Sequence, residues 1–404
     1  MKTAAKDFKM TELGPVPKDW VVKSYEDVFT HIPAKGYQVA AEEYLQGGAY
    51  PVVDQGQEPI VGFCNQKEKV YSAGNDGVIV FGDHTRIVKF VDFDFVVGAD
   101  GTQLLKGKEC STRYLAYILS VLDIPNLGYS RHFKYVKKAN FAIPPLPEQR
   151  KIAAALSDVD EMIAALEKLI EKKRKIKTGA MQRLLTGKTR LPGFKGAWVE
   201  KRLGDVFEFH SNNTLSRASM IEGRGQIYNI HYGDVLIRYG AVLDCNKTAI
   251  PCLDDAASSV CKRDFLKDGD VIIADTAEDE TVGKAVEVIN VGDRLIVSGL
   301  HTIFLRPKEG TFALGWLGYY VNSTAFHDQL LPLITGIKVS SISKGSLMDT
   351  VLRCPSTLAE QKAIAKVLGD MDEEIATLEA ELAKTRQLKQ GMMQELLTGK
   401  TRLI

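Results

Sequence analysis

The chain has only six cysteines in 404 residues, and none of them lies in a CxxC pair. Structural zinc sites usually draw thiolates from such close pairs, and disulfide frameworks are typical of small secreted domains. We therefore expect reduced thiols and no structural metal. The cysteines are Cys64, Cys110, Cys245, Cys252, Cys261 and Cys354.

Long hydrophobic runs are also absent. No apolar stretch reaches the roughly 20 residues that a membrane-spanning helix needs. The start, Met1-Lys2-Thr3, leads into a polar stretch and not into the core of a signal peptide. We expect a cytoplasmic protein with no membrane partner.

Neither sign of charge is in excess. Lys and Arg number 52 against 51 Asp and Glu, and the formal net charge is +1. A DNA-binding protein with this balance needs local basic patches, because the phosphates attract positive charge. The overall composition therefore neither supports nor excludes DNA as a partner.

Recognisable catalytic motifs are missing as well. Residues 186–189 (TGKT) end like a phosphate-binding loop, but Gln182 stands where the first glycine of GxxxxGK[ST] belongs. No GxGxxG lies between a predicted strand and a predicted helix. Residues 143–146 (IPPL) lack the polar and aromatic residues of an adenine-methyltransferase motif. We expect no catalytic residues and no enzymatic activity in this chain.

What the sequence does contain is one long segment twice. Residues 148–191 return as residues 360–403, displaced by 212 positions without a gap. The dipeptide Glu-Gln opens both copies, and the octapeptide LLTGKTRL ends both. The preceding segments also open alike, with WVVK and DVF at 20–29 and WVEK and DVF at 198–207. A repeat this long indicates a duplicated domain together with its helix.

Apolar residues in both copies recur at alternating spacings of four and three, the a/d pattern of a coiled coil. Each copy predicts a helix of about 55 Å, if it is continuous, at about 1.5 Å per residue. Proline near the start and glycine just past the end are typical of helix termini. The seam residues are Ile152, Leu156, Val159, Ile163, Leu166 and Ile170, and in the second copy Ile364, Leu368, Met371, Ile375, Leu378 and Leu382.

The obvious mate for one long helix is its own copy. Two similar halves in one chain most simply pack about a pseudo-twofold axis. If that axis crosses the helix pair, the helices are antiparallel and carry the two preceding domains to opposite ends of a spacer rod. A parallel pair satisfies the same seam, so the spacing alone leaves the direction open.

The domains that precede the helices are predicted to be α+β and mostly β. Alternating apolar runs predict strands at 77–82, 87–91, 95–97, 233–237, 269–273, 284–288 and 301–305, and short helices are expected at 114–122 and 313–321. The expected boundaries are a flexible N-terminal arm at 1–19, domains at 20–146 and 198–358, helices at 147–191 and 359–404, and a linker at 192–197.

Taken together, these features resemble the specificity subunit of a type I restriction-modification system over essentially the whole chain. The resemblance is carried by Glu148-Gln149 with Ile152, by Glu360-Gln361 with Ile364, and by the two LLTGK tails. One departure is PSTLAEQ at the second helix entrance, where the first copy has PPLPEQ. It predicts a shift of that entrance by about one residue.

The resemblance implies a fold and a set of partners. The fold is two β-rich target-recognition domains separated by two long helices in an antiparallel coiled coil, and each domain reads half of a bipartite, asymmetric site in double-stranded DNA. Two methyltransferase subunits dock on the chain, bind S-adenosylmethionine and methylate adenine N6. Restriction subunits complete the complex. The chain itself holds no cofactor.

DNA sequence is read at base edges by polar side chains, while Lys and Arg on phosphates set position and register. The candidates lie mostly in polar loops, and each residue type is also common on ordinary solvated surface. In the first domain they are Lys67, Lys69, Arg86, Tyr129, Arg131, His132 and Lys134. In the second domain they are Asn212, Asn213, Arg217, Arg224, Arg238, Lys338, Ser341 and Lys344.

Acidic residues on the outward face of the helices are identical in the two copies, although a packed seam does not require this. They favour either equal docking faces for two partner subunits or ordinary helix solubility. These residues are Asp158, Asp160, Glu161, Asp370, Asp372 and Glu373.

Two other function classes remain open from the residues alone. A non-catalytic, two-headed adaptor for protein or carbohydrate would suit the near-neutral charge. A self-contained DNA-modifying enzyme is disfavoured by the missing methyltransferase motifs. The DNA target itself is not legible, because such loops have no code of one residue per base.

Overall fold

The structure, a computed structural model, describes residues 7–98, 100–128, 130–223, 225–336 and 339–404. Contacts divide the chain into two compact units. Unit 1 comprises Met1–Glu167 and Ala380–Ile404, and unit 2 comprises Lys168–Glu379. Each unit therefore contains one β-rich domain and one part of each long helix.

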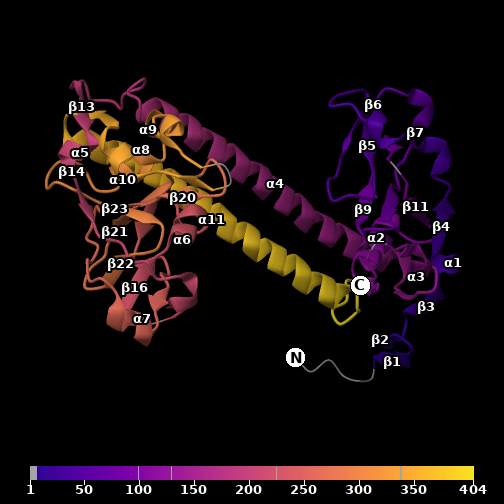
Figure 1. Cartoon of the computed structure of the whole chain (residues 1–404). Helices are drawn as coiled ribbons and strands as arrows, with labels where there is room; N and C mark the ends of the chain where they lie inside the picture. Colours follow the sequence, from indigo (N-terminus) through magenta and orange to yellow (C-terminus); the bar gives the residue numbers. More distant parts are fainter. Residues whose placement is uncertain (1–6, 99, 129, 224, 337–338) are drawn as a thin grey trace. The chain divides into compact units, whose positions relative to one another are not determined.

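Unit 1 is built on two four-stranded sheets (Figure 1). The order β4-β11-β8-β9 is antiparallel throughout, whereas β5 and β10 run parallel in the order β6-β5-β10-β7. Val53, Val80, Phe95 and Leu104 belong to one buried cluster that joins the sheets. The strands are β4 (Phe29–Ile32), β5 (Tyr50–Val53), β6 (Gly62–Cys64), β7 (Val70–Tyr71), β8 (Val78–Gly82), β9 (Val88–Val91), β10 (Phe95–Val97) and β11 (Thr102–Gly107).

A second core in unit 1 joins the domain to the long helices. Strand β3 (Val21–Ser24) pairs with β12 (Asn140–Ile143), which closes the domain on itself. Around this pair lie α1 (Tyr25–Val28), α2 (Thr112–Ser120) and α3 (Phe133–Val136). The core includes the buried rings of Trp20 and Tyr114, together with Ile152 from one long helix, Leu396 at the end of the other, and Leu397 directly after it.

The N-terminal arm is not a flexible tail over its described part. Residues 8–17 form a hairpin of β1 (Phe8–Thr11) and β2 (Gly14–Pro17), and Gly14 takes a φ of 90° at the turn. Pro17 packs so closely on Gly399 that a Cβ there would lie 2.4 Å from its Cγ. The expectation of a flexible arm is therefore wrong for this stretch, because the Gly-Pro-Val-Pro run forms a packed strand.

Unit 2 repeats the plan of unit 1 with additions. The sheet β14-β23-β19-β21-β17 matches β4-β11-β8-β9 with one more strand, and β16 pairs with β22 in parallel as β5 does with β10. Likewise β13 (Trp198–Arg202) pairs with β25 (Val351–Pro355). The other strands are β14 (Phe207–His210), β15 (Met220–Ile221), β16 (Ile227–Ile230), β17 (Val242–Asp244), β18 (Cys252–Leu253), β19 (Val271–Ala274), β20 (Thr276–Ala277), β21 (Ala285–Ile289), β22 (Leu295–Ser298), β23 (Thr302–Pro307) and β24 (Ser340–Ser341).

Much of the extra length of the second domain lies between β16 and β19, where α6 (Tyr232–Ile237) and α7 (Asp255–Val260) occur. The strand predicted at 233–237 is wrong, because this segment is α6. The Gly233 N–H donates to Nδ1 of His231 at 3.2 Å, and Asp234 occupies the first turn. These polar groups stabilise a helix start and override the apolar run. The other predicted strands are present.

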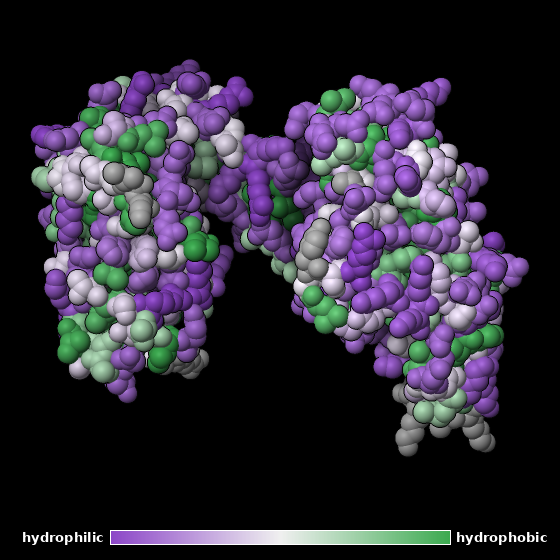
Figure 2. All heavy atoms as spheres, turned by 45° about the vertical axis from the view of Figure 1, so that its right-hand side comes forward, coloured by the Kyte–Doolittle hydropathy of each residue, from purple (hydrophilic) through white to green (hydrophobic). Residues whose placement is uncertain are grey.

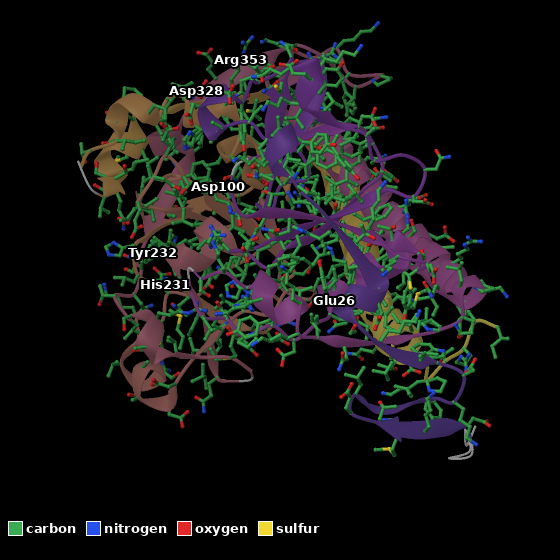
Figure 3. The ribbon with its side chains drawn as sticks, turned by 90° about the vertical axis from the view of Figure 1, so that its right-hand side faces the viewer. Glu26, Asp100, His231, Tyr232, Asp328 and Arg353 are labelled. Carbon is green, nitrogen blue, oxygen red and sulfur yellow. The ribbon has the colours of Figure 1, made fainter. Side chains whose placement is uncertain are left out.

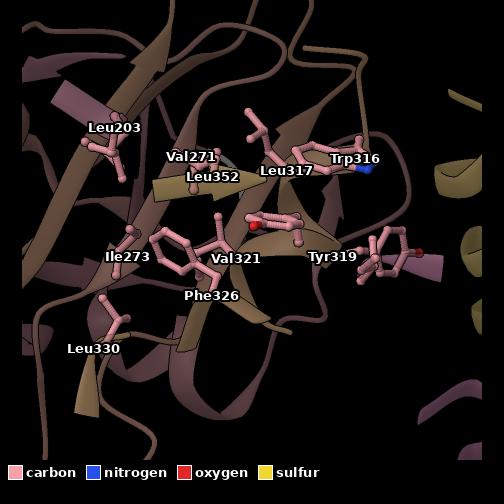
Figure 4. Close-up of a cluster of buried hydrophobic side chains, with 14 of the residues drawn as sticks. Leu203, Val271, Ile273, Trp316, Leu317, Tyr319, Val321, Phe326, Leu330 and Leu352 are labelled. Atoms are coloured by element: carbon pink, nitrogen blue, oxygen red, sulfur yellow. The ribbon is translucent and has the colours of Figure 1, made fainter. Parts of the chain in front are cut away.

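The core of unit 2 is centred on α8 (Trp316–Val321), as Figure 4 shows. Trp316 and Phe326 are fully buried there, and Ile364 and Leu368 of one long helix and Leu185, just after the other, belong to the same cluster. The remaining short helices of this unit are α5 (Leu203–Val206), α9 (Thr324–His327) and α10 (Lys344–Met348).

The long helices are α4 (Leu146–Leu184) and α11 (Leu358–Leu396), each of 39 residues. Their starts are related by the same displacement as the repeat, so the expected one-residue shift of the entrance is absent. In unit 1 Lys389 pairs with Asp160 at 2.6 Å, and in unit 2 Lys177 pairs with Asp372. The start of α4 thus lies beside the end of α11 and the reverse, which makes the coiled coil antiparallel (Figure 1).

No residue of the predicted seam is exposed. Leu166 and Ile170 of α4 and Ile375 of α11 are buried in the middle of the helices, while Val159 and Leu378 are half-buried. The helices end as their glycines predict, since Gly187 and Gly399 take φ values of 71° and 70°.

Candidate nucleic-acid interface

In unit 1, three loops meet where strands of the sheets end. The Asp83 N–H, just after β8, donates to the Gly101 carbonyl, just before β11, at 2.7 Å. The His132 N–H, just before α3, donates to the Asp83 carbonyl at 2.8 Å. We call residues 83–86, 100–101 and 130–134 the unit 1 loop cluster.

Unit 2 joins its equivalent loops in the same way. The Asp275 N–H donates to the His301 carbonyl at 3.1 Å, and the Ile342 N–H donates to the Asp275 carbonyl at 2.9 Å. Thr276 pairs with Ser341 where β20 meets β24. Residues 275–276, 299–301 and 339–344 form the unit 2 loop cluster. Each domain thus presents a polar surface at the same place in the fold.

His132 holds the unit 1 loop cluster together from the buried side of the loops. Its ring is fully buried, and Nδ1 donates to the Asp83 carbonyl at 2.9 Å. The carboxylate of Asp83 accepts the Phe133 N–H at 2.8 Å, which caps the start of α3. Because His132 is engaged in these contacts, its side chain supports the surface and does not form part of it.

The other unit 1 candidates lie on or near this surface. Arg131 and Lys134 are exposed beside the anchored His132. Arg86 takes a left-handed φ of 63° and donates to the Ile124 carbonyl at 3.0 Å. Lys67 and Lys69 lie in a 3₁₀ turn before β7, and the register of β7 on β10 puts this turn at the end where β10 leads into residue 98. Tyr129 lies outside the described residues.

In unit 2 the candidates divide into paired and unpaired side chains. Arg217 binds the buried Asp234 at 2.6 Å, and Arg238 binds Glu222 at 3.2 Å, so both guanidinium charges are compensated. Asn213 is buried, and its side chain accepts the Lys262 N–H at 2.6 Å.

Three further candidates lie nearer the unit 2 loop cluster. Asn212 is half-buried and donates to the Gly299 carbonyl at 3.4 Å, while Ser341 is half-buried and paired with Thr335. Lys344 is exposed at the start of α10. Arg224 and Lys338 lie outside the described residues.

Sequence reasoning missed an aromatic group beside the unit 2 loop cluster. The rings of His231 and Tyr232, both labelled in Figure 3, have centroids 4.5 Å apart. The ring of His301 meets Tyr232 edge-on at 5.3 Å. Burial lowers the pKa of His231, so its ring is neutral near pH 7. His301 is exposed and takes a φ of 53°. Stacking rings of this kind suit contact with bases, but only the fold brings residues 232 and 301 together.

In unit 1 the missed residue is Gln55, just after β5. Its side chain donates to the Asp100 carbonyl at 2.8 Å and accepts the His84 N–H at 3.1 Å, so it ties two loops of the cluster together. A polar residue after a strand is too common a signal to have indicated this role.

Four of the six acidic residues on the helices have cationic partners inside their own unit, and two of these, Asp160 and Asp372, also bind a tyrosine. Asp370 pairs with Lys366 at 2.7 Å, and Glu373 pairs with Lys247 at 3.7 Å. Asp160 accepts the Tyr117 hydroxyl at 2.7 Å and pairs with Lys389, whose Nζ lies 5.7 Å from the centre of the Tyr117 ring. In unit 2, Asp372 accepts the Tyr319 hydroxyl at 2.8 Å and pairs with Lys177. The repetition of this aspartate therefore has a structural reason.

Four of the acidic candidates face outward. Asp158, Glu161, Asp370 and Glu373 are all exposed. In unit 1, Asp158 and Glu161 line a groove of about 700 Å³ between α4 and the domain. Figure 2 shows a face on which hydrophilic residues predominate in both units and hydrophobic residues form small groups.

Within the described parts of the chain, no three His, Cys, Asp or Glu side chains lie in a group that could hold a metal ion. No helix among the described residues is both long enough and apolar enough to cross a membrane.

Comparisons with known proteins agree with this architecture. Residues 17–178 match the family model of the Type I restriction modification DNA specificity domain. The specificity subunit of the type I restriction enzyme MjaVIII from Methanocaldococcus jannaschii is 24% identical over 438 aligned positions, which cover 98% of this chain and 96% of that one.

Two solved structures share the fold. The S subunit of a type I restriction-modification system from M. genitalium has a TM-score of 0.61 at 16% identity. The alignment covers 96% of this chain and 97% of that subunit. A chain from a study of complex assembly and conformational transition of the type I R-M system has a TM-score of 0.53 at 18% identity, with 96% and 99% covered.

The curated relative is named as the specificity subunit of a type I restriction enzyme. Residues 17–178 thus match a type I restriction modification DNA specificity domain, and nearly the whole chain is similar in sequence and in fold to specificity subunits of type I restriction-modification systems.

Proposed function

We propose that each domain reads one half of a bipartite, asymmetric site in double-stranded DNA. The supporting observation is that the two domains share one arrangement of strands but carry different side chains in their loop clusters. The loops of the unit 1 cluster present Arg131 and Lys134. The loops of the unit 2 cluster present His301 and Lys344, and Tyr232 of α6 contacts His301 beside them. Different side chains at equivalent places would read different bases, which is what an asymmetric site requires.

The repetition of the same contacts in both units is evidence for two equivalent partner subunits. The same Tyr–Asp–Lys contact and the same exposed acidic residues occur on the long helices in both units. We propose that these equivalent faces, with Asp158 and Glu161 in unit 1 and Asp370 and Glu373 in unit 2, bind two methyltransferase subunits. These subunits would bind S-adenosylmethionine and methylate adenine N6 in cytoplasmic DNA, and restriction subunits would join through them.

Domain exchange tests this function. Residues 198–358 are replaced by the equivalent domain of a relative with a known target, and in a second variant residues 20–146 are replaced. N6-methyladenine is then mapped at base resolution in cells that carry each hybrid. Each exchange should alter one half of the methylated motif and leave the other half unchanged. A change in both halves from a single exchange would refute independent reading.

A further inference from the structure

Four exposed cations gather around α3 in unit 1. Arg131, Lys134, Lys137 and Lys138 lie within eight residues, and all four are exposed. None of them makes an ion pair with a carboxylate of the described residues, whereas Arg113 elsewhere in the domain is paired with Asp92. We call these four residues the α3 basic surface.

The helix that carries this surface, α3, is fixed to the domain by buried contacts on its inner side. Phe133 and Val136 on the inner side of α3 are buried in the core. Asp83 accepts the Phe133 N–H with its carboxylate and the His132 N–H with its carbonyl. The cations are also positioned by rings, since Lys134 Nζ lies 5.2 Å from the ring centre of Tyr135. Anchored cations lose less conformational freedom when they bind than cations on a free loop do.

Among the residues that the structure describes, unit 2 has no equal surface at the equivalent place. Lys344 is the first residue of α10, and its Nζ donates to the His210 carbonyl at 3.2 Å. Where unit 1 continues with Lys137 and Lys138 after the buried Val136, unit 2 continues with Met348 and Asp349 after the buried Leu347. Asp349 forms an ion pair with Arg202.

We infer that the α3 basic surface binds phosphates of the DNA duplex and supplies a positioning contact that unit 2 lacks. This inference rests on the proposed function of the domains. Four unpaired cations beside the unit 1 loop cluster complement a polyanion. Contacts of this kind set register and affinity, and they carry no base specificity of their own. The two domains would therefore read their half-sites with unequal electrostatic support.

The test compares two double variants in the chain purified with its methyltransferase subunits. Lys134→Gln with Lys137→Gln removes two cations of the α3 basic surface. Lys18→Gln with Lys108→Gln removes two exposed cations elsewhere in unit 1 and serves as the charge-matched control. Fluorescence anisotropy measures binding to a duplex that carries the methylated motif between 50 and 200 mM salt.

The loss of two phosphate contacts should make the slope of log affinity against log salt shallower by about two units. Between those salt concentrations, the affinity advantage of the unchanged complex should shrink about tenfold. The preference for the motif over a scrambled duplex should stay the same at fixed salt. The control should keep the original slope. An unchanged slope for Lys134→Gln with Lys137→Gln would overturn the inference.

Two further measurements distinguish a failure of this inference from a failure of the proposed function. Lys344→Gln in unit 2 should change the slope by about one unit at most, and a change as large as that of the α3 pair would refute the asymmetry between domains. If the unchanged complex shows no preference for its motif, the proposed function itself fails. If it prefers the motif but ignores the α3 substitutions, only the present inference fails.

Discussion

Arg402 binds Glu148 with two parallel hydrogen bonds, from Nε to Oε1 at 2.6 Å and from Nη2 to Oε2 at 2.7 Å. In unit 2, Arg190 binds Glu360 in the same way, with both bonds at 2.5 Å. Each pair joins the tail that follows one long helix to the start of the other. The Glu-Gln opening and the LLTGKTRL tail recur together because each provides the partner for the other copy.

Arg402→Ala should destabilise unit 1 by about 2–3 kcal/mol, since it leaves a buried carboxylate without its cation. Glu148 is 4% exposed and would retain only the Trp20 indole N–H at 3.2 Å. The bonds to Glu148 and then Asp19 raise the pKa of Arg402, as expected for a strong pair. Urea unfolding measures the loss.

The control for this variant is Arg386→Ala. Arg386 pairs with Glu167 on the exposed surface of the helices, where a single pair contributes less than about 1 kcal/mol. Equal losses in the two variants would show that burial of Glu148 does not set the strength of the contact.

Tyr117→Phe and Tyr319→Phe should have nearly equal effects. Each hydroxyl donates to the equivalent aspartate of its unit, and burial raises the pKa of both phenols, so they remain protonated donors. The loss should be about 1 kcal/mol of unfolding free energy in each case. A large effect in one unit and none in the other, measured by chemical denaturation, would argue against a functional pseudo-twofold repeat.

Leu166→Asp combined with Leu378→Asp should disrupt the helix pair. Leu166 is 8% exposed, and an unpaired charge there costs several kcal/mol. The double variant should melt at a lower temperature and fail to co-purify with methyltransferase subunits. Met162→Asp, at a position that is 46% exposed on α4, should retain both properties. Normal assembly by the double variant would contradict a scaffold role for the coiled coil.

Loss of the proton from the buried carboxyl group of Glu287 should make unit 2 less stable as the pH rises. Burial raises its pKa from 4.5 to about 7, although it accepts the N–H groups of Gly315 and Gly318 at 2.7 and 2.8 Å. The folded state holds this proton more tightly than the unfolded chain does. The resulting stabilisation is complete below about pH 4.5 and is lost as the pH rises through about 7, up to about 3 kcal/mol.

Glu287→Gln removes this titration, so its melting temperature should vary less between about pH 5.5 and pH 8 than that of the unchanged chain. Glu309→Gln, at an exposed position, is the control and should preserve the original pH dependence. An unchanged pH dependence in Glu287→Gln would show that another group is responsible.

The repeat predicted the long helices well, because a/d spacing and terminal glycines are local signals. Seam positions such as Leu166 and Ile375 are buried as that spacing requires. The spacing left the direction of the pair open, and contacts between the helices, such as those of Lys389 and Lys177, determine it.

The loops and short helices were harder to predict, since long-range contacts determine them. A side-chain cap at His231 turned an expected strand into α6. Asp160 is repeated as Asp372 because of Tyr117 and Tyr319, whose spacing differs from that of the repeat. The meeting of Asp83 with Gly101 and His132 depends on strand order, which no local pattern contains.

The most direct measurement is a base-resolution map of N6-methyladenine in host DNA with and without this gene. If the chain determines the target, a split motif with a fixed gap should be methylated in the unchanged strain and unmethylated in the deletion. Returning the gene should restore that motif. A map in which every methylated motif persists after the deletion would contradict the account.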